Sequence, residues 1–247
     1  MRWLYDNKVE ASTIYPLTEN PDFLFDTALK DTRLSRIGKT LSKEDQTFIF
    51  DLGSAYAVNY ITILGSNITA TAVIKIEGNS SDAWVTPAFY QSFTTGQLIT
   101  YFDTETYQYW RLSIDDPDNA EDELTIGNIF IGSYLQLPYM GKTQKLPTAS
   151  SSSSSESVSG QSYMDIGLLY KYGTIVFPVV SDTEKTSIDT AFTFLNKFKP
   201  FILLVWENDL TFQPPIYSKL TTDMDFTRVD GIVGRTWSLS FAFKQTF

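Results

Sequence analysis

The sequence predicts a mostly β protein with two domains that are joined by a serine-rich linker. Before residue 137, short segments alternate apolar with polar side chains and are separated by Gly, Asn and Asp, as in a sandwich or jelly roll. A polar stretch follows and holds an unbroken serine run, Ser150–Ser155. One helical pattern lies beyond it. We therefore expect a jelly-roll sandwich in 1–137, a Ser-rich linker in 138–161, and a smaller β-barrel-like domain with one helix in 162–247.

The first domain is expected to hold strands at a spacing of roughly ten residues. Residues 6–45 contain Pro16 and Pro21 and show no strand period, so we expect them to wrap around the sandwich; a partly flexible arm is the alternative. The expected anchors of this segment are Phe23, Leu24, Phe25 and Leu29. The predicted strands are 2–5, 47–53, 58–64, 72–77, 98–102, 107–114 and 124–135.

The last two of these strands are predicted to close the sandwich as a hairpin. The turn between them, 115–123, is acidic. Pro117 and the Asp and Asn residues beside it favour a turn, because proline fixes φ and Asp and Asn side chains bond to nearby backbone. So many carboxylates suggest a calcium site, but the spacing lacks the glycine and the closing glutamate of an EF-hand loop. A solvated turn is the favoured interpretation, and no metal site is predicted.

Composition excludes several functions. The net charge of −10 argues against nucleic-acid binding, which needs a basic surface to release counterions. Because the chain has neither Cys nor His, thiol nucleophiles, Ser-His pairs and the usual zinc sites are excluded. A glycosidase needs two carboxylates at a defined separation. Among 29 acidic residues some pair will always fit, so the sequence cannot identify such a pair. We predict no enzyme activity, no catalytic residue and no cofactor.

The N-terminus lacks the apolar core of a signal peptide, and the longest strongly apolar run, Phe201–Trp206, is too short to span a bilayer. A soluble chain without membrane insertion is therefore expected. In the second domain, Ser181 and Glu184 have the spacing of a capping box, which predicts a helix over 182–196. Phe201–Trp206 should be a central strand under that helix, and 236–243 alternates as a terminal strand with one apolar face. That face is expected in the domain's own core, with a neighbouring subunit as the alternative.

The order of segments over about Phe48–Leu137 resembles the discoidin-like, galactose-binding-type β-sandwich. More narrowly, it is similar to the version found in structural proteins of tailed-phage virions. The resemblance rests on FDLGSAYAVNYITILGSNIT (50–69), YQYWRLSIDDPDN (107–119) and ELTIGNIFIGSYL (123–135). The second domain looks similar to tail-tube-derived domains that form rings beneath the tube, through SGQSYMDIG (159–167), KPFILLVWEND (199–209) and the strand near Trp237.

This resemblance implies a structural protein of a phage tail tip or baseplate, of the distal-tail type. The C-terminal domain would assemble a homo-oligomeric ring and contact other tail proteins of the tube and hub, and the sandwich would face the host surface. The protein would then be made in the cytoplasm of a bacterial host and end in the tail of the virion.

The alternative function is a carbohydrate-binding module that recognises bacterial surface glycans. Discoidin-like sandwiches often bind sugars through loops at one end, by aromatic stacking with polar neighbours. The candidate stacking residues are Trp84, Phe89 and Tyr90, and Asp82 is the candidate polar partner. Aromatic residues in loops also cover cores and subunit contacts, so this interpretation competes with a purely structural one.

Overall fold

The computed structural model describes residues 1–94, 99–138, 146–156, 162–165, 167–196, 198–204, 215–230 and 235–246. They form two compact units. The sandwich unit consists of Asp6–Tyr134, and the helix-sheet unit combines Met1–Tyr5 with Leu135–Thr246. Most of the elements are strands, as predicted. Within these described ranges, no helix is long and apolar enough to cross a membrane.

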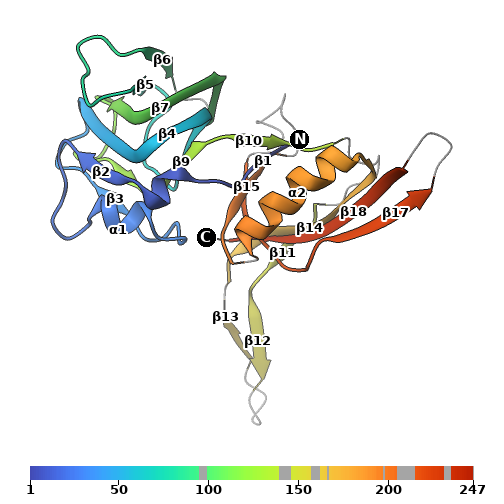
Figure 1. Ribbon diagram of the computed structural model, residues 1–247. Coiled ribbons are helices and arrows are strands. Elements are labelled where there is room, and N and C mark those ends of the chain that lie inside the picture. The colour runs from blue at the N-terminus through green and yellow to red at the C-terminus, as the bar shows by residue number, and fades with distance from the viewer. Residues whose placement is uncertain are drawn as a thin grey trace. The chain divides into compact units, whose positions relative to one another are not determined.

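The sandwich unit is built on one large sheet with the order β2-β4-β7-β5-β6, to which β9 adds by pairing with β4 (Figure 1). A small second sheet joins β3 to β8. The elements are η1 (Lys8–Ala11), β2 (Thr13–Pro16), α1 (Phe25–Leu29), β3 (Gly38–Lys39), β4 (Gln46–Leu64), β5 (Val73–Asn79), β6 (Phe89–Thr94), β7 (Ile99–Asp115), β8 (Thr125–Ile126) and β9 (Asn128–Gly132).

Two long strands, β4 and β7, pair with each other in the large sheet. Their register shifts between Asp51 and Tyr56 and again after Val58, so each strand bends where the ladder is interrupted. Gly53 lies in this bend with φ +76°, a conformation that glycine adopts without steric cost. Beyond the bend, β4 pairs with β9. The sequence predicted separate strands here because the bend has the composition of a turn.

The N-terminal segment wraps the sandwich, as expected. The Phe25 ring is fully buried and meets the Phe48 ring edge-on, with 4.7 Å between the centroids. Leu29 is buried in the same core. The other two expected anchors, Phe23 and Leu24, are exposed. The wrap therefore depends on α1, whose buried face supplies the apolar contacts.

The predicted closing hairpin is wrong. The β7 strand pairs with β4 and β5, whereas β8 pairs with β3 and β9 pairs with β4. The acidic turn connects β7 of the large sheet with β8 of the small sheet, and Asp116 in this turn is fully buried. Its Oδ2 accepts hydrogen bonds from the Thr69 backbone N–H at 2.9 Å and from Asn119 Nδ2 at 3.0 Å, and its Oδ1 accepts one from the Thr69 hydroxyl. Asp116 thus ties the turn to a distant loop, and the described residues contain no cluster of three acidic groups suited to a metal ion.

The helix-sheet unit holds the sheet β10-β1-β15-β16-β18-β14-β11, with β17 pairing with β18. These strands pair as an open path, so the described part of the unit is an open sheet instead of a closed barrel. The elements are β1 (Arg2–Leu4), β10 (Tyr134–Gln136), β11 (Thr148–Ser150), β12 (Ser153–Glu156), β13 (Ser162–Asp165), β14 (Leu169–Val180), α2 (Asp182–Leu195), β15 (Phe201–Leu204), β16 (Ile216–Leu220), β17 (Asp225–Asp230) and β18 (Arg235–Gln245).

Helix α2 matches its prediction. The Ser181 side chain accepts a hydrogen bond from the Glu184 backbone N–H, the Glu184 carboxylate accepts one from the Ser181 backbone N–H, and Asn196 ends the helix in the left-handed conformation. The helix packs its apolar stripe on the sheet. Trp3 stacks on Phe241 with 5.7 Å between the ring centroids. The apolar face of β18 is therefore buried in the unit's own core, as expected.

The units differ from the predicted domain boundaries at two places. First, β1 pairs with β15 in the helix-sheet unit although it precedes the sandwich in the chain. Since β10 lies next to β1 in that sheet, the sandwich is an insertion between neighbouring strands. Second, the range expected to be a linker contains β11 and β12 in its described part. The β12 strand pairs with β13 as a small sheet of its own (Figure 1).

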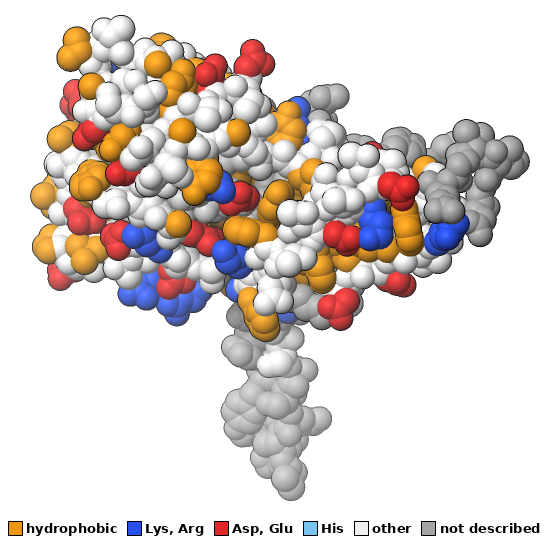
Figure 2. Space-filling view, viewed as in Figure 1, with side chains coloured by type: hydrophobic (Ala, Val, Ile, Leu, Met, Phe, Trp, Pro, Cys, Tyr) orange, Lys and Arg blue, Asp and Glu red, His pale blue; other side chains and the backbone are white. Residues whose placement is uncertain are grey.

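Charged side chains of both signs are mixed on the face shown in Figure 2. On the loop after α1, Arg33 Nη2 lies 2.7 Å from Asp31 Oδ2 and Arg36 Nη1 lies 3.3 Å from the same oxygen. The hydrogen bond from Arg33 holds the pKa of the Asp31 carboxyl well below its usual range. These arginines are thus engaged with a carboxylate of the same loop.

Candidate functional site

A row of side chains crosses the outer face of the large sandwich sheet, on the side away from the core. The register places Tyr15 of β2 opposite Ile49 of β4, and Ile49 opposite Arg111 of β7. Arg111 lies opposite Glu77 of β5, which in turn lies opposite Tyr90 of β6. These five residues are called the outer row. Their inward neighbours along each strand form the core, so period-two alternation fixes which face the row occupies.

An ion pair lies at the centre of the outer row. Arg111 Nε donates to Glu77 Oε2 at 2.5 Å. The Glu77 side chain is 7% exposed and that of Arg111 is 23% exposed, so the carboxylate is largely withdrawn from water while the guanidinium is partly accessible. Charge-assisted hydrogen bonds of this kind are short and orient both groups. The pair therefore holds a cation in a fixed position on an otherwise open sheet face.

The loop between β5 and β6 folds back over this ion pair. Asn79 Nδ2 donates to the Ala83 carbonyl at 2.6 Å, which tightens the loop. Trp84 Nε1 then donates to Asp82 Oδ1 at 2.6 Å, and the Arg111 guanidinium carbon lies 4.8 Å from the centroid of the Trp84 ring. Two independent contacts therefore fix the indole, one at its N–H and one against its face.

Tyr90 completes the surface as an exposed ring. Its side chain is 54% exposed, and its strand lies two positions from β7 in the sheet. Neighbouring strands are about 4.8 Å apart, so Tyr90 and Arg111 are separated by about 10 Å at the backbone. The surface therefore presents two aromatic side chains with polar groups between them. The chemistry that it offers is stacking and hydrogen bonding.

Three of the four predicted site residues lie on this surface, and the fourth lies in the core. Asp82, Trp84 and Tyr90 belong to the surface just described. Phe89 points to the opposite face of β6, where its ring packs against Phe102 at 4.9 Å and against Trp110 at 5.8 Å between centroids. Phe89 is therefore a core residue, because adjacent residues of a strand face opposite sides.

Sequence reasoning missed Glu77 as a member of the site. The structure pairs Glu77 of β5 with Arg111 of β7, and both strands are inner strands of the sheet. The two are far apart in the chain, and only the β5–β7 register brings them together. The available signal was the alternation in 72–77, which puts Lys75 and Glu77 on the polar face of β5.

No protein-family model matches this chain, and no curated protein matches it. Solved structures with some similarity include the CBM32 of AlyQ in complex with 4,5-unsaturated mannuronic acid, at 20% identity and a TM-score of 0.38. That comparison covers 52% of this chain and 96% of the module. The lectin domain of lectinolysin complexed with Lewis B antigen gives 12% identity, a TM-score of 0.41, and coverage of 52% and 97%.

A third similar structure is chitosan-binding module 1 from a chitosanase/glucanase of Paenibacillus sp. IK-5. It gives 17% identity and a TM-score of 0.41, with 52% of this chain and 99% of the module covered. Because these TM-scores are low, the function proposed below rests on the side chains of the sandwich unit and not on these similarities.

Proposed function

We propose that the protein binds glycans through the sandwich unit, with Trp84 and Tyr90 as stacking residues. Asp82 and Arg111 would supply the polar contacts, and Glu77 would hold Arg111 in place. The observation that carries this proposal is the indole of Trp84, which is fixed by Asp82 and by Arg111 beside an exposed Tyr90.

The physical argument starts from the two faces of a sugar. A pyranose ring has an apolar C–H face that stacks on an aromatic side chain, and hydroxyl groups at its rim that need hydrogen-bond partners. The two aromatic side chains supply the first requirement. Asp82 supplies acceptors, and the partly exposed Arg111 supplies donors, for the second. A separation of about 10 Å between the strands of Tyr90 and Arg111 would span two sugar rings.

A glycan array of the full-length protein tests this proposal. The expected result is retention on a defined group of glycans, and loss of at least tenfold in affinity for Trp84→Ala and Tyr90→Ala. Phe198→Ala is the matched control, because Phe198 is a 76% exposed aromatic residue of the other unit. Equal binding by Trp84→Ala, Tyr90→Ala and the control would contradict the proposal, as would the absence of any retained glycan.

A second proposal concerns the setting in which the sandwich acts. We propose a structural role in the tip or baseplate of a phage tail, with the helix-sheet unit as the assembling body. The insertion of the sandwich between β1 and β10 supports the division into an assembling body and an added module, because an insertion between adjacent strands leaves the rest of the sheet unaltered. The protein would be made in the bacterial cytoplasm and end in the virion.

Light scattering of the full chain over a range of concentrations tests the assembly. A defined multiple of 28.0 kDa is expected if the helix-sheet unit forms a ring. A monomer at every concentration would contradict homotypic assembly, and the glycan-binding proposal would be unaffected.

A further inference from the structure

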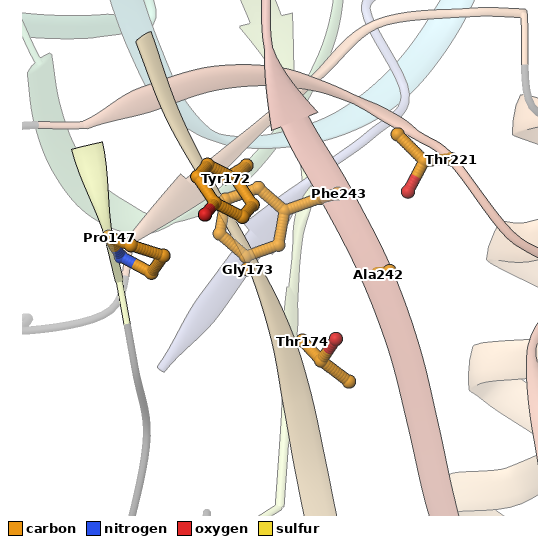
Figure 3. Close-up of a pocket in the computed structure, with 7 residues that line it drawn as sticks. All are labelled: Pro147, Tyr172, Gly173, Thr174, Thr221, Ala242 and Phe243. Atoms are coloured by element: carbon orange, nitrogen blue, oxygen red, sulfur yellow. The ribbon is translucent and has the colours of Figure 1, made fainter. Parts of the chain in front are cut away.

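The helix-sheet unit carries an open hollow on the sheet face that lies opposite α2. Its volume is about 460 Å³. Figure 3 shows the side chains of Tyr172 and Pro147 on one side and that of Thr221 on the other. Small residues at Gly173 and Ala242 leave this space open between the strands β14 and β18. The remaining lining residues are Thr174 and Phe243.

The lining combines an aromatic wall with hydroxyl groups. Tyr172 is 42% exposed, so its ring is available for a flat apolar contact. The side chains of Thr174 and Thr221 are exposed and can donate or accept hydrogen bonds. Among the residues that the structure describes, none of those lining the hollow carries a carboxylate. Ligand pockets have volumes of about 300–1,000 Å³, so this hollow is large enough for a sugar-sized molecule.

Two lysines lie beside the hollow on the same sheet face. Lys244 lies directly opposite Tyr172 on one side and directly opposite Lys219 on the other. Along their strands, Lys244 is two residues from Ala242 and Lys219 is two residues from Thr221. Like charges directly opposite each other in a sheet are destabilising.

Neither Lys219 nor Lys244 forms a salt bridge with a carboxylate of the described residues, although the chain has 29 acidic residues and 19 basic ones. The Lys244 ammonium instead lies 4.2 Å from the centroid of the Tyr170 ring. An anion bound beside the hollow would attract both ammonium groups and offset their repulsion.

We infer that this hollow binds a small sugar that carries an anionic group, either a phosphate or a carboxylate. The sugar ring packs on Tyr172 and its hydroxyls bond to Thr174 and Thr221. The anionic group meets Lys244 and Lys219, and its charge offsets their mutual repulsion. This site lies in the helix-sheet unit and is separate from the glycan surface of the sandwich.

Isothermal titration calorimetry of the full chain tests the inference with four probes: glucose 6-phosphate, glucuronate, inorganic phosphate and glucose. At least one of the two anionic sugars should bind at least tenfold more tightly than either phosphate or glucose. Whichever anionic sugar binds identifies the anionic group. Binding that is no tighter than that of phosphate would overturn the assignment of a sugar, and no binding of either anionic sugar would overturn the site.

Variants separate this site from a structural role of the lysines. Lys244→Gln and Lys219→Gln should each weaken binding at least tenfold, and without ligand each should melt at the same temperature as the wild type or higher, because a repulsion is removed. Lys30→Gln, at an exposed lysine of the sandwich unit, is the control and should bind normally. Trp84→Ala should also bind normally. Unchanged affinity in both lysine variants would overturn the inference.

Discussion

The ion pair beneath Trp84 makes a sharp prediction about stability. Replacing Arg111 by Met keeps an apolar stem but removes the guanidinium that pairs with a carboxylate that is 7% exposed. The Glu77 side chain would then remain charged in a largely dehydrated position. Arg111→Met should therefore destabilise the sandwich unit more than a surface substitution does.

The magnitude follows from the exposure of the two groups. Breaking a fully buried ion pair costs about 3–5 kcal/mol, whereas exposed pairs contribute about 0–1 kcal/mol. Arg111 is 23% exposed, so the Glu77–Arg111 pair lies between these limits and the loss should be about 2 kcal/mol. The double variant Glu77→Gln with Arg111→Met has no unpaired charge and should fall within about 1 kcal/mol of the wild type. The two substitutions are therefore expected to be strongly non-additive.

Differential scanning calorimetry of the full chain measures this effect on the transition of the sandwich unit. For a unit of this size, a loss of about 2 kcal/mol lowers the melting temperature by about 8 °C. Lys75→Met is the matched control, because Lys75 is an exposed cation of the same face, and it should change stability by less than about 0.5 kcal/mol. A loss below about 0.5 kcal/mol for Arg111→Met, or additive effects in the double variant, would refute the reasoning.

Three further predictions concern other positions. Gly132→Ala should unfold at a lower temperature, because its Cβ would lie 2.2 Å from the Asp6 carbonyl oxygen. Ser181→Ala removes the cap of α2 and should cost about 1 kcal/mol in urea denaturation of the helix-sheet unit, whereas Ser181→Asp should not. Burial, and to a lesser extent the charge of Glu105, raises the pKa of Tyr107 in the folded protein. As the pH rises above 10, Tyr107 therefore ionises first in the unfolded chain, and the stability of the sandwich unit should fall. Tyr107→Phe should lack this alkaline loss, and an unchanged pH profile would contradict the assignment.

Local patterns predicted the elements whose signals lie within a few residues of each other. The capping box of Ser181 and Glu184 and the alternation of the last strand both appear in the structure as expected. The long strand β4 was divided in the prediction because glycine at position 53 suggested a turn, whereas in the structure this glycine lies in a bend. The closing hairpin failed because the burial of Asp116 depends on Thr69, which is distant in the chain.

The residues of the candidate surface also divide into those that the sequence places close together and those that only the fold brings together. Asp82 and Trp84 are two residues apart, and their proximity could be read from the sequence. Glu77 and Arg111 meet only through strand register, which periodicity alone does not specify. Phe89 and Tyr90 are adjacent aromatic residues, and only the direction of the β6 pleat separates the core residue from the exposed one.

The position of β1 also imposes an order on folding during synthesis. The strand β1 is made before the sandwich but pairs with β15, which is made only after the whole sandwich and most of the helix-sheet unit. Domains generally fold as units as the chain is produced, so the sandwich can reach its native state before β1 can pair with β15. Trp3 cannot reach its native place between Phe201 and Phe241 until those residues have been made. Completion of the second core is therefore a late, long-range step, and such contacts form slowly.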